Sequence, residues 1–174
     1  MTDHVRGSIR PELPEDCAAV RRVNELAFKG PNEAALVDSL RAAGAVVLSL
    51  VAVDQGDIVG HILFTPVEIA SGSESVAAVG LAPMAVLPSH QGRGIGSELV
   101  RQGLAELRRA DHGIVVVLGH PEYYPRFGFR RASGYDVRWE RAAPDEAFML
   151  LELRSGALRG RGGIARYHRA FKKI

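Results

Sequence analysis

The hydrophobic positions of the chain recur with two different spacings, which separate predicted helices from predicted strands. Near the N-terminus apolar residues return every three or four positions, as on the buried face of a helix. This spacing predicts helices over residues 15–29 and 32–43, ended by Gly30 and Gly44, with Asn32 as a cap for the second. The apolar face predicted for the first helix comprises Ala19, Val20, Val23, Leu26 and Ala27.

Farther along the chain, β-branched and apolar runs bounded by turn residues predict strands. The sequence Asp-Gln-Gly-Asp at residues 54–57 is typical of a hairpin turn. The run 76–87 is apolar almost throughout, as in a strand buried on both faces, but Pro83 cannot donate a ladder hydrogen bond. We therefore expect a bulge or an unpaired edge near Pro83. The predicted strands are 8–11, 46–53, 58–65 with a continuation over 67–70, 76–87, 114–118, 137–140 and 148–153.

A glycine-rich turn at residues 91–96 connects the run 76–87 to a predicted helix over 94–110. That helix has apolar residues at helical spacing, and the buried strand 114–118 follows it, which completes a strand–helix–strand unit. Residues 121–127 are expected to form one or two helical turns. The pattern as a whole predicts an α/β protein, and 174 residues without a visible boundary predict one domain over 1–174.

Composition adds limits on the class of protein. Hydrophobic residues make up 47% and charged residues 24%, which is ordinary for a globular chain, and the lone Cys17 cannot form an internal disulfide. No signal peptide is evident, and the longest apolar runs are shorter than the roughly 18 residues that a membrane span needs. The six histidines have no metal-like spacing. We expect a cytoplasmic protein without a membrane partner and without a metal.

Charge is unevenly distributed although the net charge is only +2. Residues 154–174 contain seven Lys or Arg and no acidic residue, and the remainder has 15 basic against 20 acidic side chains. A basic segment can meet nucleic acid. Only Tyr167 and Phe171 could stack on bases there, so the expectation is a solvated tail or a dimer contact rather than a nucleic-acid site.

The glycine-rich turn Gln-Gly-Arg-Gly-Ile-Gly lies between a buried strand and a helix, where free backbone N–H groups and the helix dipole favour an anion. A phosphate loop of the Walker type would end in Gly-Lys-Ser or Gly-Lys-Thr, and this one ends in Gly-Ser-Glu. A dinucleotide fingerprint would have glycine where Ser97 stands. The remaining interpretation is a loop that binds the pyrophosphate of coenzyme A.

Residues 84–99, Met-Ala-Val-Leu-Pro-Ser-His-Gln-Gly-Arg-Gly-Ile-Gly-Ser-Glu-Leu, resemble the acetyl-CoA motif of the GNAT superfamily of N-acetyltransferases. Residues 119–129, Gly-His-Pro-Glu-Tyr-Tyr-Pro-Arg-Phe-Gly-Phe, are similar to its tyrosine-containing segment in a bacterial branch of predicted acetyltransferases. The resemblance extends over nearly the whole chain. It implies a mixed, mostly antiparallel central sheet with a splayed, bulged cofactor strand and helices on both faces.

The resemblance also implies where acetyl-CoA binds. Backbone groups of Met84, Ala85 and Val86 would hold the pantetheine arm and the acetyl carbonyl, and the glycine-rich turn would hold the pyrophosphate. A bulge at Pro83 fits this expectation, because it frees backbone groups for a ligand. The residues implied for the phosphate end are Gln91, Gly92, Arg93, Gly94, Ile95, Gly96 and Ser97.

Acetyl transfer to nitrogen needs a neutral amine and a proton for the departing thiolate. A lysine-like amine is neutral in only about one molecule in 2,500 at pH 7, so a base or desolvation must supply it. Tyr124 stands where the family commonly has its general acid, with Tyr123 as its rival. Many members have a carboxylate on the cofactor strand, but residues 76–97 contain no Asp or Glu. The candidates for the base are Glu33, Glu68 and His120.

The sequence therefore predicts an acetyl-CoA-dependent N-acetyltransferase in which a primary amine attacks directly in a ternary complex. The alternative is a module that binds acetyl-CoA as a sensor without transfer. Small amines, peptide N-termini and protein lysines all remain open as acceptors, and a homodimer is a family-level expectation.

Overall fold

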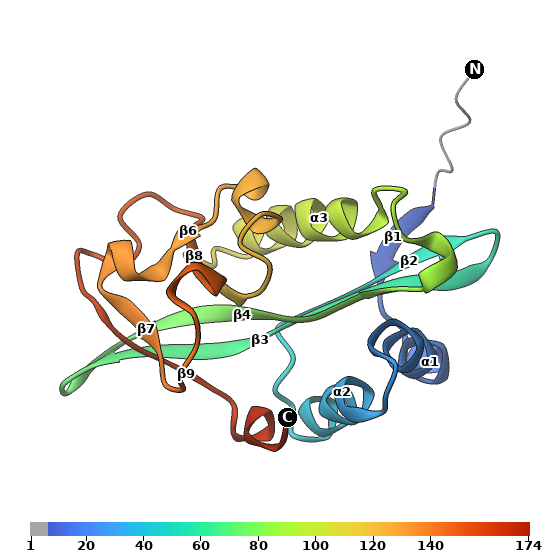
Figure 1. The fold of residues 1–174 in the computed structure, drawn as a ribbon, viewed down its shortest axis with the longest axis horizontal. Helices are drawn as coiled ribbons and strands as arrows, with labels where there is room; N and C mark the ends of the chain where they lie inside the picture. The colour runs from blue at the N-terminus through green and yellow to red at the C-terminus, as the bar shows by residue number, and fades with distance from the viewer. Residues whose placement is uncertain (1–6) are drawn as a thin grey trace.

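The computed structural model describes residues 7–174, and within them a nine-stranded sheet forms the centre of the fold. Three α-helices cover the sheet, α1 and α2 on one face and α3 on the other (Figure 1). The helices are α1 (Cys17–Phe28), α2 (Asn32–Ala42) and α3 (Ile95–Arg109). The strands are β1 (Ser8–Pro11), β2 (Leu48–Asp54), β3 (Asp57–Ser71), β4 (Glu74–Val86), β5 (Ile114–Leu118), β6 (Arg130–Arg131), β7 (Val137–Trp139), β8 (Phe148–Glu152) and β9 (Gly163–Tyr167). Short 3-10 turns are η1 (Pro14–Asp16), η2 (Pro88–His90), η3 (Tyr124–Phe127), η4 (Ala132–Tyr135), η5 (Asp145–Ala147) and η6 (Arg169–Lys173).

The strand order is β1-β2-β3-β4-β5-β8-β6, with β9 paired to both β3 and β7. Only the β4–β5 and β7–β9 pairs are parallel. The prediction of a mixed, mostly antiparallel sheet with helices on both faces is confirmed. Residues 67–70 do continue the strand beyond Pro66, because β3 runs unbroken to Ser71 and pairs with β9 there.

The β4 strand departs from regular pairing on both of its edges. Its register with β3 shifts where Ala82 and Pro83 together lie opposite Leu63, so the bulge predicted near Pro83 is present. On the other edge β4 pairs with β5 only at Val79 and Gly80. Beyond Gly80 the two parallel strands separate, and the second half of β4 presents an unpaired edge toward β5.

The buried faces of the helices follow the predicted pattern only in part. The apolar stripe of α3 is fully buried, with Leu99, Val100, Leu104 and Leu107 each 4% exposed or less. In α1 the prediction for Leu26 is wrong, since this side chain is 45% exposed and the polar Asn24 is buried. Asn32 is not the cap of α2, because the helix starts at Asn32 itself and Pro31 precedes it without a side-chain cap bond.

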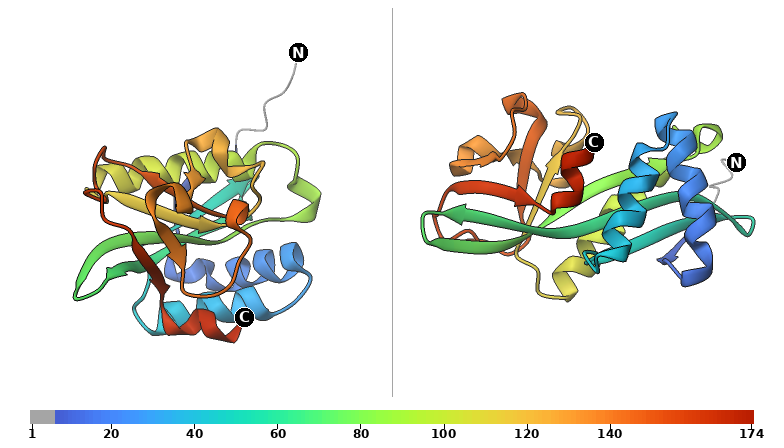
Figure 2. Two further views of the ribbon diagram at one scale, coloured as in Figure 1. Left: turned by 60° about the vertical axis from the view of Figure 1, so that its left-hand side comes forward. Right: turned by 90° about the horizontal axis from the view of Figure 1, so that it is seen from below.

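The segment 154–174 is not a solvated tail, so that expectation is wrong. Its β9 strand pairs with β3 and β7, and its η6 turn packs beside α2, with Phe171 buried (Figure 2). Tyr167 and Phe171 pack edge to face, 5.1 Å between centroids, and both belong to the folded core of this segment rather than to a free tail. The basic charges decorate a folded part of the sheet instead.

None of the helices in residues 7–174 has the length and apolar character that crossing a membrane requires.

Candidate active site

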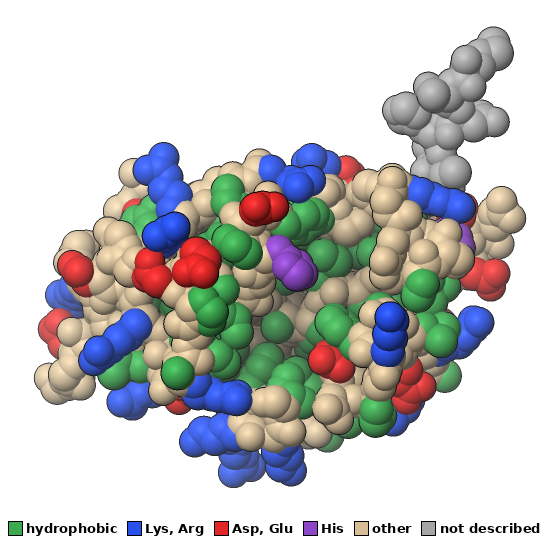
Figure 3. Space-filling model, viewed as in Figure 1, with side chains coloured by type: hydrophobic (Ala, Val, Ile, Leu, Met, Phe, Trp, Pro, Cys, Tyr) green, Lys and Arg blue, Asp and Glu red, His purple; other side chains and the backbone are tan. Residues whose placement is uncertain are grey.

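Where β4 and β5 separate, the surface opens into a cleft of about 900 Å³. Figure 3 shows it as a hollow in the middle of one face with mostly hydrophobic walls. The β4 strand forms its floor, and the turn before α3 forms one end. The ends of α1 and α2, the residues after β5, and the C-terminal segment form the remaining walls.

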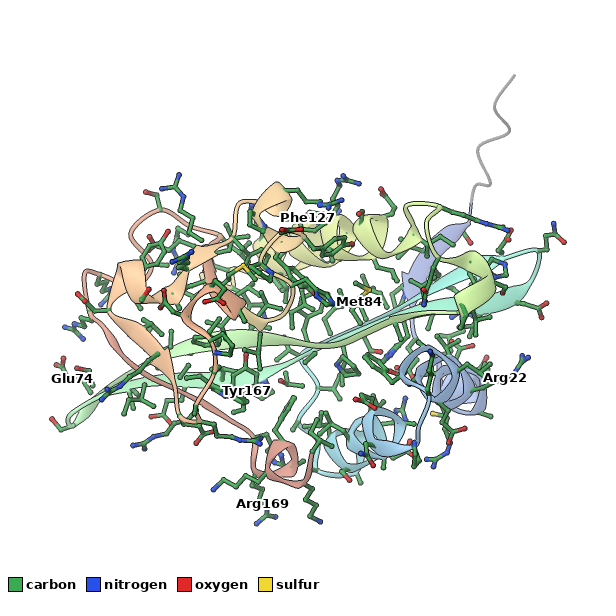
Figure 4. All side chains as sticks on the ribbon, in the orientation of Figure 1. Arg22, Glu74, Met84, Phe127, Tyr167 and Arg169 are labelled. Carbon is green, nitrogen blue, oxygen red and sulfur yellow. The ribbon has the colours of Figure 1, made fainter. Side chains whose placement is uncertain are left out.

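The second half of β4 borders the cleft with consecutive residues, among them the predicted Met84, Ala85 and Val86. These three pair with β3 on one edge only, which leaves the backbone of the other edge directed toward β5. An extended ligand with amide groups could add to this edge as a further strand would. Figure 4 labels Met84 on the side of β4 that faces α3.

The glycine-rich turn is shaped as an anion site. Gly92 and Gly94 have left-handed backbones, with φ of 74° and 82°, and a Cβ on either would meet only open space. Gly94 is the cap residue of α3 and supplies no side chain to its first N–H groups, so those donors are free for a ligand. Gln91 instead braces the turn, since its Nε2 donates to the Val86 carbonyl at 3.0 Å.

Most of the predicted phosphate residues border the cleft, but Arg93 does not. Gln91, Gly92, Gly94, Ile95, Gly96 and Ser97 all belong to the lining. Arg93 is exposed and does not belong to the lining.

Tyr123 and Tyr124 point in different directions from the same turn, with ring planes at 90° and centroids 5.1 Å apart. The Tyr123 hydroxyl shares a 3.1 Å hydrogen bond with the Ser97 hydroxyl, at the start of α3. Tyr124 is 7% exposed and lies against Gly119, where a Cβ would come within 2.4 Å of its ring. Tyr123 thus belongs to the phosphate end of the cleft and Tyr124 to the point where β4 and β5 separate.

Burial raises the pKa of the Tyr124 phenol well above its ordinary value, and the neighbouring Tyr123 adds to the effect. The phenol therefore stays protonated throughout the physiological range. A thiolate leaving a thioester is a weaker base than the phenolate, so Tyr124 can protonate it only by being positioned against the sulfur.

The three candidate bases are in different places. Glu33, at the start of α2, and His120, just after β5, both border the cleft. Glu68 does not, because it is exposed on the second half of β3, between its pairing partners Ala77 and Arg166. Within residues 7–174 no group of three or more His, Cys, Asp or Glu side chains forms a metal-binding cluster.

Sequence reasoning missed one wall of the cleft, which comes from the C-terminal segment. Trp139 of β7, Tyr167 of β9 and Phe171 of η6 all border it. The centroids of the Trp139 and Tyr167 rings are 6.0 Å apart, and the two ring planes meet at an angle of 74°. The only signal in the sequence was the pair of aromatics in the basic segment, and their partners lie far away along the chain.

A buried polar network links β2 and β3 to α1 and α2. The Asn24 amide nitrogen donates to Nδ1 of His61 at 3.1 Å, so the other ring nitrogen bears the proton and donates to Ser49 Oγ at 3.0 Å. Ser49 and Arg41 both bind the Glu12 carboxylate. Burial lowers the pKa of His61 despite the nearby Glu12 carboxylate, so the imidazole is neutral.

Burial alone would raise the pKa of Glu12. The hydrogen bonds from His61 and Ser49, with the positive Arg41, outweigh that effect and hold the pKa below its ordinary value.

Comparison with known proteins agrees with this geometry. The sequence profile of the acetyltransferase (GNAT) domain matches residues 8–132. The uncharacterized N-acetyltransferase YhbS of Escherichia coli K12 is 36% identical over 167 residues, covering 95% of this chain and 99% of that protein.

Two solved structures are similar over almost the whole chain. The crystal structure of Escherichia coli YhbS in complex with CoA has a TM-score of 0.92 and 35% identity, and covers 99% of this chain and 95% of its own. A GNAT family acetyltransferase from Brucella melitensis in complex with acetyl-CoA has a TM-score of 0.80 and 40% identity, and covers 97% of this chain and 99% of its own. The splayed β4, the glycine-rich turn and the matched profile have one explanation: the chain belongs to the GNAT family of N-acetyltransferases.

Proposed function

We propose that this enzyme binds acetyl-CoA along the free edge of β4 and transfers the acetyl group directly to a primary amine in a ternary complex. One observation carries the proposal: the unpaired edge of β4 and the glycine-rich turn before α3, separated only by the short η2 turn, border the same cleft. A backbone edge suits the amide groups of pantetheine, and the adjoining helix N-terminus suits the pyrophosphate. The complexes of two similar proteins with CoA and acetyl-CoA support this arrangement.

In this proposal Met84, Ala85 and Val86 bind the pantetheine arm and the acetyl carbonyl through their backbone. The turn from Gln91 to Gly96, with Ser97, binds the pyrophosphate through backbone N–H groups. Backbone donors near the acetyl carbonyl also stabilise the oxyanion that develops during attack.

The chemical step forms one bond and breaks another. The amine nitrogen attacks the thioester carbonyl carbon, the C–S bond breaks, and the electron pair leaves with sulfur. Tyr124 donates its proton to the departing thiolate, because its phenol is protonated and borders the cleft beside Gly119, just after β5. No acyl-enzyme forms.

The amine must lose a proton before it attacks. Glu33 and His120 are the two candidates that border the cleft, from opposite walls. Glu68 receives no role, since it is exposed outside the cleft.

The test has two stages with purified protein. Calorimetric titration with acetyl-CoA is expected to give micromolar binding, with NADH as a control that does not bind. Coenzyme A release is then measured with a panel of amines, and at least one amine is expected to accelerate it. Absence of acetyl-CoA binding contradicts the proposal, and binding without any amine-dependent release favours the acetyl-CoA sensor.

A further inference from the structure

The cleft continues past the predicted acetyl position into a space bounded by three aromatic side chains, Trp139, Tyr167 and Phe171, which we call the aromatic wall. Their rings follow one another, with centroids 6.0 Å apart for Trp139 and Tyr167 and 5.1 Å apart for Tyr167 and Phe171. All three come after residue 132, where the match to the family profile ends. The aromatic wall therefore lies outside the part of the chain that the family profile matches.

The helices α1 and α2 form the opposite side of this space. Phe28, the last residue of α1, is 41% exposed and borders the cleft, as does the buried Leu36 of α2. Leu36 belongs to the same hydrophobic cluster as Phe171, so α2 and the C-terminal segment meet beneath the space. Glu33 lies three residues before Leu36, hence on the same face of α2.

Two charged side chains that border the cleft here, Arg141 and Glu33, differ in whether they already have partners within the protein. Arg141 borders the space, but its guanidinium donates to the backbone oxygens of Phe171 and Ile174 and lies 5.0 Å from the centre of the Trp139 ring. Arg141 thus fastens the C-terminal segment to the aromatic wall. None of the ion pairs found among residues 7–174 involves Glu33, which leaves its carboxylate at the border of the cleft without a charged partner there.

We propose that the acceptor is a primary amine attached to an apolar group, an arylalkylamine or an alkylamine, and this rests on the proposed function. Its ammonium group binds the Glu33 carboxylate, and its apolar part packs on the aromatic wall. The area of the aromatic rings favours apolar surface that leaves water. A carboxylate and three rings that border one cleft match an ammonium on an apolar carrier.

The same surroundings disfavour two other kinds of amine. A polyamine would bring a second ammonium group toward the aromatic wall and the Arg141 guanidinium, where the second charge would lose its hydration without a carboxylate. A small hydroxylated amine would bind Glu33 but leave the aromatic wall uncovered.

The test compares initial rates of coenzyme A release with 2-phenylethylamine, hexylamine, ethanolamine and spermidine at saturating acetyl-CoA. Burial of a phenyl or hexyl group predicts kcat/KM about tenfold or more above that of ethanolamine. Spermidine is expected to fall near ethanolamine. A higher kcat/KM for ethanolamine or spermidine overturns the acceptor assignment while leaving acetyl transfer intact.

Two variants test the named contacts. In Glu33→Gln the KM for 2-phenylethylamine is expected to rise about tenfold, with the Kd for acetyl-CoA unchanged. Glu146→Gln is the matched control, because Glu146 is exposed in η5 and does not border the cleft. In Phe171→Leu, which retains an apolar side chain, the preference for 2-phenylethylamine over ethanolamine is expected to shrink several-fold.

Each contrary result overturns one part of the proposed acceptor site. An unchanged KM in Glu33→Gln overturns the ammonium pair, and an unchanged preference in Phe171→Leu overturns the packing. If acetyl-CoA binds in the calorimeter but none of the four amines is acetylated, the acceptor assignment is wrong, and direct transfer then loses support relative to the sensor.

Discussion

One end of the cleft is formed mainly by backbone groups and the other mainly by side chains. The phosphate end consists mainly of backbone from residues 84–97, with two left-handed glycines and a free helix N-terminus, and Tyr123 joins it through Ser97. The acceptor end consists of side chains from α1, α2, β7, β9 and η6, which are more than a hundred residues apart in the sequence at their extremes. A site made of backbone tolerates sequence change wherever the turn geometry survives, whereas a site made of side chains changes with each substitution.

The two ends also differ in how the family profile covers them. The profile match covers the phosphate end and stops at residue 132, before Trp139, Tyr167 and Phe171. Four variants or conditions would break or sharpen this contrast.

The largest effect is expected for Phe171→Ala at the acceptor end. Phe171 is 7% exposed, and removal of a buried phenyl ring costs about 3 kcal/mol of unfolding free energy. Urea denaturation measures this loss, and kcat/KM for the preferred amine is expected to fall about tenfold. The Kd for acetyl-CoA should change by no more than about twofold, and a parallel loss of acetyl-CoA affinity would show that the two ends are not separate.

Tyr124→Phe addresses the point where the two ends meet. Loss of a general acid lowers kcat by about a hundredfold, while the retained ring preserves the packing on Gly119. Its matched partner is Tyr123→Phe, which removes the hydrogen bond to Ser97. This variant should weaken the binding of acetyl-CoA a few-fold with little change in kcat. Stopped-flow or steady-state rates give kcat and calorimetry gives the Kd for acetyl-CoA, so the two variants can be distinguished. If Tyr123→Phe loses kcat and Tyr124→Phe loses only affinity, the general acid is Tyr123.

Gly94→Ala tests the backbone character of the phosphate end, with Gly56→Ala as its control. The two glycines have similar backbones, φ of 82° and 88°, and neither Cβ would touch the protein. Both variants should lose about 1 kcal/mol of stability from left-handed strain. Only Gly94→Ala should weaken the binding of acetyl-CoA, by about tenfold, because the added methyl group would occupy the space proposed for the phosphate. Equal affinities in calorimetry would mean that the turn is merely structural.

The smallest effect concerns pH and the buried polar network. His61 has a lowered pKa in the folded state, so between that pKa and the ordinary value of 6.5 the unfolded chain binds more protons than the folded one. Stability therefore rises with pH in this window and falls as the pH drops below about 6.5, by at most about 1.4 kcal/mol per pH unit.

Glu12 acts in the same direction at lower pH, because its folded pKa is also lowered and its stabilisation is lost as the pH falls below its ordinary value of 4.5. Urea denaturation at pH 7.5 and 5.5 isolates the histidine contribution. The difference in unfolding free energy between the two pH values should be smaller in His61→Gln than in the unaltered protein. If the two proteins show the same difference, the acid sensitivity comes from another group.

Local chemistry explains which features were predictable. Pro83 lacks an N–H, so a defect in β4 followed from one residue, and the structure has the bulge there. The glycine-rich turn before α3 followed from adjacent residues in the same way. The β9 strand was missed because its five residues, Gly163–Tyr167, become a strand only through pairing with β3 and β7.

The errors at single residues also have physical causes. Leu26 has an apolar side chain, but α1 turns toward the sheet the face that carries Val20, Val23 and Asn24. The buried Asn24 is acceptable there because His61 provides a hydrogen-bond partner from β3, which no pattern within the helix could indicate. Glu68 was a reasonable base by sequence position, but it lies on the part of β3 beyond the cleft, paired with β9.

By itself, the sequence determined the family, the order of most elements, the bulged strand and the glycine-rich turn before α3, because each depends on neighbouring residues and on backbone chemistry. Only the tertiary structure decided which carboxylates border the cleft and that an aromatic wall forms part of its lining. Those features depend on side chains that meet across long separations in the chain, where sheet pairing and helix orientation, rather than local sequence, bring Glu33 to the same cleft as Trp139, Tyr167 and Phe171.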